Sequence, residues 1–110
     1  MRHATDKEIA LLEELISKAN IDISPDWKDN LLVSNLSDEG MGSLSLYPSG
    51  VACKKRKFGS QVSDCLFKDI DGVAVIASLY LDEEGDLYEL DIWKTDFGTL
   101  EEISEDFQDV

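Results

Sequence analysis

The strongest pattern in the chain is a pair of β-rich runs between residues 73 and 97. The first run, residues 73–81, is apolar at nearly every position, which is typical of a central strand covered on both faces. The second run alternates, with Tyr88, Leu90 and Ile92 on one face and Leu87, Glu89, Asp91 and Trp93 on the other. A short acidic segment separates the runs, so the pattern predicts a β-hairpin in which Gly85 takes a positive φ.

The first twenty residues predict an amphipathic helix. Thr5 and Glu8 have the spacing of a capping box, in which the two residues satisfy backbone N–H groups at the start of a helix. Leucine and isoleucine then recur at helical spacing as far as Ala19. Asn20 tolerates the left-handed conformation that ends many helices, so we expect a helix from about Asp6 to Ala19.

Three shorter runs, residues 31–36, 43–47 and 61–68, predict further strands, because turn residues separate them. Together with the helix and the hairpin they predict an α+β fold, with the N-terminal helix packed on a single antiparallel sheet of about five strands. The length fits a single domain, 1–110. The predicted core comprises Ile9, Leu12, Ile16, Val75, Leu79, Leu90 and Ile92.

Two further segments, the connector after the helix and the C-terminal tail, bear on the extent of this core. Trp27 is expected to dock the connector after the helix onto the core. In the acidic tail, at about residues 101–110, Ile103 and Phe107 are four residues apart. The tail either docks as a short helical turn or frays.

Charge is the outstanding feature of the composition. The formal net charge is −14, from 24 acidic and 10 basic residues. Residues 82–110 hold 12 of those acids and one base, Lys94, so they carry −11 of the −14. Such a field repels nucleic acids and anionic membranes and attracts basic partners. The only basic cluster, residues 54–57, lacks interleaved aromatic residues for stacking on bases, and we expect it to compensate neighbouring acids.

The sequence gives no sign of export. It has neither an apolar signal segment after Met1 nor an 18-residue apolar run, which predicts a cytoplasmic protein. We therefore expect Cys53 and Cys65 to be reduced, although adjacent strands could still bring them together.

Chemistry-bearing motifs are missing, so we expect no enzyme and assign no catalytic residue. The single histidine, His3, precedes the helix, and no nucleophile elbow, P-loop or dinucleotide motif occurs. The two cysteines are too far apart for a zinc site without histidines nearby. Residues 82–86 lack the spacing of a calcium loop and fit an acidic hairpin turn. We expect no metal and no cofactor.

Glu89, Asp91 and Trp93 lie on one face of the second hairpin arm. This face fits an ordinary solvated surface, and it equally fits an acidic docking strip with an aromatic anchor. If Trp93 is buried in the core, its role is structural and the acids act alone.

Residues 81–97 resemble a C-terminal signature of a family of small, uncharacterised bacterial domains. In that family a hairpin ending in Glu-Leu-Asp-Ile-Trp-Lys-x-Asp-Phe closes a fold that begins with a helix, and the likeness extends upstream to residues 40–44. By its size and acidity the chain is also similar to immunity proteins of contact-dependent growth inhibition. Those proteins bind a toxin domain, often a basic nuclease, and mask its active site.

This resemblance implies an immunity protein, monomeric when free, that neutralises a cognate basic toxin domain, a nuclease, by occlusion. The alternative is a cytosolic domain that binds a small ligand or a protein without catalysis. The expected toxin-binding residues are acids of the last quarter, with Trp93 as anchor: Asp82, Glu83, Glu84, Asp86, Glu89, Asp91 and Asp96.

Overall fold

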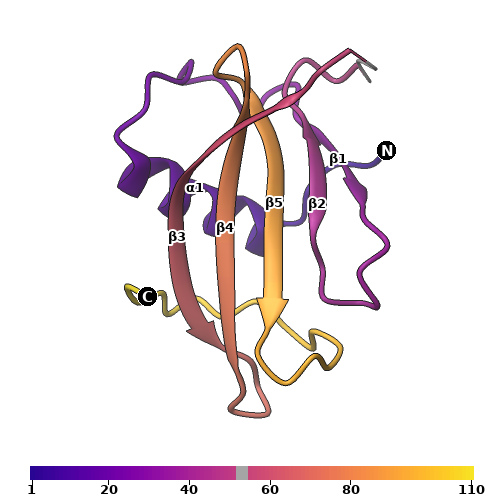
Figure 1. Ribbon diagram of the computed structural model, residues 1–110, viewed down its shortest axis with the longest axis vertical. Coiled ribbons are helices and arrows are strands. Elements are labelled where there is room, and N and C mark those ends of the chain that lie inside the picture. Colours follow the sequence, from indigo (N-terminus) through magenta and orange to yellow (C-terminus); the bar gives the residue numbers. More distant parts are fainter. Residues whose placement is uncertain (52–54) are drawn as a thin grey trace.

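A computed structural model describes residues 1–51 and 55–110, and over these residues it has one helix and five strands (Figure 1). This confirms the predicted α+β class. Cys53 and Lys54, for which the sequence predicted a free thiol and a compensating charge, lie outside the described residues. In chain order the elements are α1 (Asp6–Ala19), β1 (Leu32–Asn35), β2 (Leu44–Tyr47), β3 (Phe58–Lys68), β4 (Ala74–Asp82) and β5 (Leu87–Lys94).

The five strands form one antiparallel sheet in the order β1-β2-β5-β4-β3. The predicted hairpin is confirmed, because β4 pairs with β5 from Val75 opposite Lys94 to Leu81 opposite Leu87. Gly85 has φ +86° at its turn, as expected. The hairpin therefore lies at the centre of the sheet, and β1 and β3 are its outer strands.

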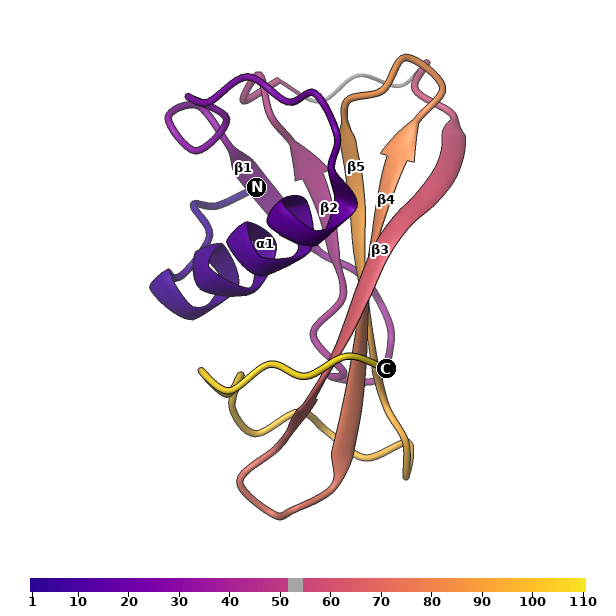
Figure 2. The ribbon, with the colours of Figure 1, turned by 90° about the vertical axis from the view of Figure 1, so that its left-hand side faces the viewer.

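One face of the sheet is covered and the other is open (Figure 2). Helix α1 and the C-terminal tail lie on the same side, so the prediction that both faces of β4 are covered was wrong. On the open side Ala74, Ile76 and Tyr80 are half-buried by neighbouring side chains. The upper part of β3 crosses in front of β4 in Figure 1, and there the Phe58 ring packs 5.2 Å from that of Tyr80.

Helix α1 begins and ends as predicted. Thr5 and Glu8 form the capping box, and Asn20 ends the helix with φ 53°. Its buried stripe is centred on Leu11, Leu12 and Leu15, together with Glu8. Ile9 and Ile16 are seven residues apart and lie together at one edge of this stripe, so they are only partly buried, which corrects their prediction as core. The other predicted core residues are buried, namely Leu12, Val75, Leu79, Leu90 and Ile92.

A β-bulge changes the expected alternation of β5. Glu89 lies opposite Tyr80 and Leu87 lies opposite Leu81, so Tyr88 is an extra residue between two consecutive pairs. An inserted residue reverses the alternation on one side of it. Leu87 is consequently buried with Leu90, and its predicted place on the face of Glu89 was wrong.

The C-terminal tail docks, but without a helical turn. Ile103 is buried, and the Phe107 ring packs edge-on against Phe67 at 6.2 Å. Gln108 and Leu66 exchange two backbone hydrogen bonds of 2.8 Å. The tail therefore lies extended beside β3. Trp27, as expected, packs its ring against the core.

Cys65 is fully buried and is unpaired among the described residues. Burial raises the pKa of its thiol to about 11, so the group is inert at neutral pH. No helix in the described ranges, 1–51 and 55–110, has the length and apolar character needed to cross a membrane.

Candidate functional site

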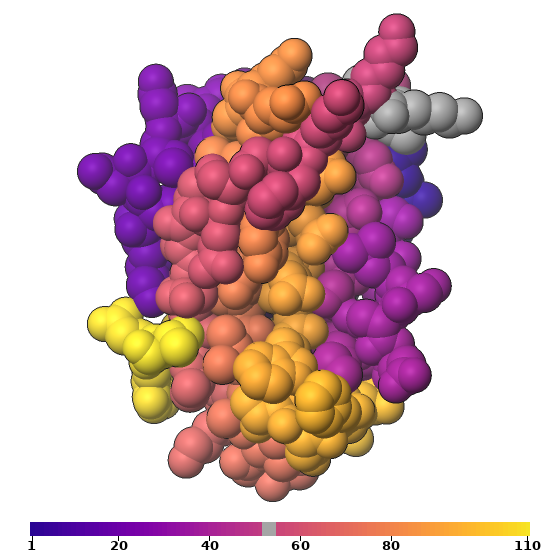
Figure 3. Space-filling model, in the orientation of Figure 1, coloured from indigo at the N-terminus to yellow at the C-terminus, as the bar shows by residue number. Residues whose placement is uncertain are grey.

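The open face of β5 carries the predicted acidic strip. Glu89, Asp91 and Trp93 lie opposite Tyr80, Ser78 and Ile76 of β4, and all six residues belong to the open side of the sheet. Trp93 is 42% exposed, so it belongs to the surface and not to the core. Figure 3 views this face and shows the orange lower end of β5 and the following loop projecting toward the viewer.

Within the strip, Glu89 experiences the negative charge of Asp91. Burial and the charge of Asp91 raise the pKa of Glu89. Burial and the charges of both acids likewise raise the pKa of the Tyr80 hydroxyl. Both shifts reflect partial burial first and the neighbouring negative charge second.

Asp82 does not belong to this surface. It is 7% exposed, and one carboxylate oxygen accepts hydrogen bonds from the N–H groups of Glu84 (2.9 Å) and Asp86 (3.0 Å). The other oxygen accepts one from Arg56 Nε at 3.0 Å. Asp82 therefore holds the β4–β5 turn together, whereas Glu83, Glu84 and Asp86 are exposed around it.

Arg56 is a structural residue at the upper end of the sheet. Beyond Asp82, its guanidinium donates to the carbonyl oxygens of Leu46, at 2.6 Å, and of Leu87. These carbonyls belong to β2 and β5, whose pairing is confined to Leu44–Leu90 and Ser45–Glu89. The guanidinium thus bridges two strands where their ladder has ended, and its Cζ lies 5.9 Å from the ring centroid of Tyr47 and 5.1 Å from that of Tyr88.

Lys55 and Lys57 of the basic segment lie beside the acidic turn. Lys55 and Lys57 line a surface pocket together with Glu83 and Glu84. The Glu83 N–H also donates to the Lys57 carbonyl at 3.0 Å. The expectation that this cluster compensates neighbouring acids is confirmed at Arg56, by its ion pair with Asp82. The upper end of the molecule therefore contains both signs of charge.

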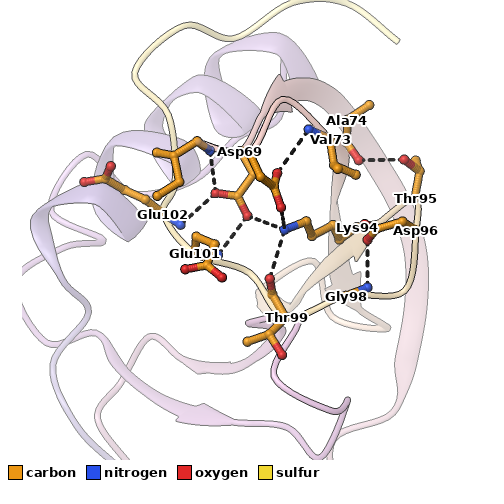
Figure 4. A network of polar contacts seen from close by, with 12 residues as sticks. Asp69, Val73, Ala74, Lys94, Thr95, Asp96, Gly98, Thr99, Glu101 and Glu102 are labelled. Carbon is orange, nitrogen blue, oxygen red and sulfur yellow. Dashed lines mark hydrogen bonds and ion pairs between the residues drawn. The ribbon is translucent and has the colours of Figure 1, made fainter.

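Lys94, the only base of the acidic quarter, is buried at the lower end of β5 (Figure 4). Its ammonium donates to Asp69 at 2.9 Å, to Asp71 at 2.6 Å and to the Thr99 carbonyl at 3.0 Å. Because the Lys94 ammonium is paired with Asp69 and Asp71, it does not act as a counter-ion for the nearby surface acids.

Asp69 is the centre of the same network. Besides Lys94, it accepts hydrogen bonds from the N–H groups of Ile70 (2.7 Å), Glu101 (2.8 Å) and Glu102 (3.0 Å). Burial alone would raise the pKa of this carboxyl, but the backbone N–H groups and the Lys94 ammonium together lower it to about 2. The network fixes both ends of the 95–100 loop (Figure 4).

This loop presents a second aromatic ring. Phe97 is 67% exposed, has φ +62°, and its ring lies 6.1 Å from that of Trp93. Its N–H donates to the Lys94 carbonyl at 2.8 Å. Asp96, a predicted site residue, is exposed and accepts from the Gly98 N–H at 2.8 Å, so it also shapes the loop.

A shallow hollow lies beside Trp93, between β5 and the β1–β2 loop. Asp91 and Trp93 form one side, and the loop supplies Asp38, Glu39 and Met41. The sequence prediction missed these loop residues, because they lie some fifty positions before β5. The available signal was the turn at residues 37–42 directly before a strand, but nothing in the sequence paired that strand with β5.

The hollow has a fixed wall. Asp38 accepts hydrogen bonds from the N–H groups of Met41 (3.1 Å) and Ser43 (2.8 Å). Burial opposes ionisation of Asp38, yet the hydrogen bonds outweigh it and lower the pKa, so the carboxylate is charged at neutral pH. The Leu100 N–H donates to the Gly40 carbonyl at 3.0 Å and ties this loop to the 95–100 loop.

Apart from the buried Asp82, the predicted site residues thus fall into three places. Glu89, Asp91 and Trp93 are together on the open face; Glu83, Glu84 and Asp86 surround the upper turn; Asp96 lies in the lower loop. Within residues 1–51 and 55–110, no three His, Cys, Asp or Glu side chains converge to hold a metal ion. The open face presents carboxylates and exposed aromatic rings.

Comparison with known proteins places the chain in a family. Neither a curated protein nor a solved structure matches it. One family model, a domain of unknown function named DUF6984, matches residues 1–104. Since this match covers nearly all of the described fold, the chain belongs to the DUF6984 family.

Proposed function

We propose that this protein is a cytoplasmic immunity protein that binds a cognate basic toxin domain, a nuclease, and neutralises it by occlusion. The observation that carries the proposal is the open sheet face, where Glu89 and Asp91 lie in one row with an exposed Trp93 on the central strand β5. A nuclease must present a positive groove to hold phosphates, and a rigid acidic surface can fill that groove without chemistry.

The charge distribution supports fast recognition. Most of the net charge of −14 lies in the last quarter of the chain. Opposite charge steers proteins together and raises association rates above about 10⁶ M⁻¹s⁻¹ at low salt. Fast capture suits protection against a toxin that enters the cell in few copies. The likeness of the hairpin to small bacterial domains and of the whole build to immunity proteins points the same way.

The first test uses gene context and rescue. We expect a neighbouring open reading frame that encodes a large secreted protein with a variable C-terminal domain. Expression of that domain alone should stop growth, and co-expression of this protein should restore it. The two proteins should then co-purify as a complex. A toxic domain that this protein neither binds nor neutralises contradicts the proposal.

The second test concerns the surface that binds. Reversing the charge at Glu83, Glu84, Glu89 and Asp91 together should lower the association rate with that toxin domain and flatten its salt dependence, because steering depends on the summed charge. An unchanged rate in low salt contradicts a role for these acids.

The alternative, a cytosolic domain that binds a small ligand, finds its support in the hollow beside Trp93. A thermal-shift screen with metabolites and Ca²⁺ separates the two functions. A saturable increase in Tm with one compound favours the ligand-binding alternative.

A further inference from the structure

The lower end of the open face combines exposed aromatic rings with carboxylates that have no counter-ion in the chain. Trp93 and Phe97 present their rings next to the hollow bordered by Asp38, Glu39 and Asp91. Among the ion pairs formed by the described residues, none includes these three acids. Large exposed rings beside unpaired charge are features of a binding surface.

Backbone strain is concentrated at the same place. In the described parts of the chain, three non-glycine residues have positive φ: Asn20, Glu39 and Phe97. Asn20 ends the helix, where this conformation is ordinary. Glu39 lines the hollow and Phe97 contacts Trp93 at its margin. A bulky residue held in this region costs about 1–3 kcal/mol, and a ring that is 67% exposed recovers little of that through packing.

The surface is also fixed before any partner arrives. Lys94 anchors the 95–100 loop through Thr99, and the Leu100 N–H joins that loop to Gly40. Asp38 holds the other wall through two backbone hydrogen bonds. A preorganised site loses less conformational entropy on binding, so its contacts yield more affinity.

The upper end of the molecule offers a contrast. Glu83 and Glu84 share a surface pocket with Lys55, Arg56 and Lys57. A cationic partner would have to displace or tolerate these bases there. Among the described residues, no base lines the hollow at the lower end, so short-range charge complementarity favours that hollow.

We infer that the hollow at the lower end of the open face receives an arginine side chain of the partner, an inference that rests on the proposed function. The guanidinium stacks on Trp93 and donates to the carboxylates of Asp91 and Glu39. Arginine fits better than lysine, because its planar group stacks on aromatic rings and donates to carboxylates in pairs, and it is more weakly hydrated. In a nuclease, an arginine of the phosphate-binding groove supplies this chemistry.

Two variants with the same change in charge test the inference. E39Q/D91N removes two charges at the hollow, and E83Q/E84Q removes two at the upper turn. With the toxin domain identified by rescue, E39Q/D91N should raise the dissociation rate on the order of 100-fold. E83Q/E84Q should lower the association rate a few-fold and leave the dissociation rate unchanged, because its charges act only through steering. Equal dissociation rates for the two variants overturn the inference.

The arginine itself is located by double-mutant cycles. Each arginine of the toxin domain is changed to lysine and measured against the wild type and Asp91→Asn. One arginine should weaken binding roughly 30-fold in the wild type and much less in Asp91→Asn. If no arginine is coupled to Asp91, the inference is wrong while the proposed function stands. Circular dichroism and Tm of each variant verify the fold, and a wild-type protein that binds no toxin contradicts the proposed function itself.

Discussion

The Lys94 ammonium lies 2.9 Å from a carboxylate oxygen of Asp69, and the side chains of both residues are almost completely buried, at 2% and 0% exposure. This pair joins the end of β5 to the turn between β3 and β4, and Asp69 extends the connection to the tail through Glu101 and Glu102. A buried charge is stable only when its partners are in place. The pair therefore makes three distant segments depend on one another.

The change Asp69→Asn should destabilise the protein by about 3–5 kcal/mol, because it leaves the Lys94 charge without its buried counter-ion. Urea unfolding followed by circular dichroism measures the loss. Asp71→Asn is the matched control: Asp71 also pairs with Lys94 but is 42% exposed, and its loss should be below about 1 kcal/mol. Equal losses would show that Asp69 has no special role. Amide exchange at Glu101 and Glu102 should quicken only in Asp69→Asn.

Protonation of the Asp69 carboxylate should contribute to unfolding of the protein in acid. The pKa of Asp69 is about 2 in the folded protein, below its ordinary value of about 3.9. A lowered pKa gives stability that is present above about pH 4 and is lost as the pH falls toward 2, in total about 2–3 kcal/mol. Urea midpoints between pH 6 and pH 2.5 should reveal this slope, and Asp69→Asn should show a shallower one. Parallel slopes in the two proteins would assign acid unfolding to other groups.

Arg56→Lys should cost about 2 kcal/mol although it keeps the charge. One ammonium cannot reproduce the fork that reaches Asp82 and the carbonyls of Leu46 and Leu87, and a carbonyl left unpaired is costly where it is buried. Thermal unfolding provides the measurement. The exposed Lys55→Ala serves as control and should change stability by less than about 0.5 kcal/mol. A Tm for Arg56→Lys equal to that of the wild type would contradict the bridging role.

Phe97→Gly should stabilise the free protein by about 1 kcal/mol while weakening its complex. Glycine adopts positive φ without strain, and the exposed ring contributes little to folding. Phe97→Ala separates the two effects, because it removes the ring and keeps the strained backbone. Both variants should bind the toxin domain less tightly, and only Phe97→Gly should have a raised Tm. A lowered Tm in Phe97→Gly would mean that the ring stabilises the fold.

The helix and the central hairpin could be predicted because their signals are local. The capping box, the apolar spacing of α1 and the turn glycine all lie within a few residues of the structure they specify. The sheet order could not, because pairing of β2 with β5 joins segments some forty residues apart. The bulge at Tyr88 was hidden for a related reason, since it appears only when β5 is matched against β4.

The site divides in the same way. The shared face of Glu89, Asp91 and Trp93 follows from the two-residue period of a strand and was predicted correctly. The burial of Asp82 was not predictable, because it depends on Arg56, which reaches it from the segment before β3. The burial of Lys94 could not be predicted either, because its partners Asp69 and Asp71 come from another turn.

The outer strands β1 and β3 are each partly covered by a terminal segment of the chain, which limits how a partner can bind. Arg2 forms a bridge to Val33 of β1, and Gln108 forms one to Leu66 of β3. Both bridges occupy main-chain groups at positions where a foreign strand could otherwise add to the sheet. A partner at the open face meets side chains more than backbone, because β5 lies inside the sheet between β2 and β4. Surface substitutions on β5 can therefore alter selectivity while the scaffold is preserved, which would allow related proteins to diverge in their choice of partner.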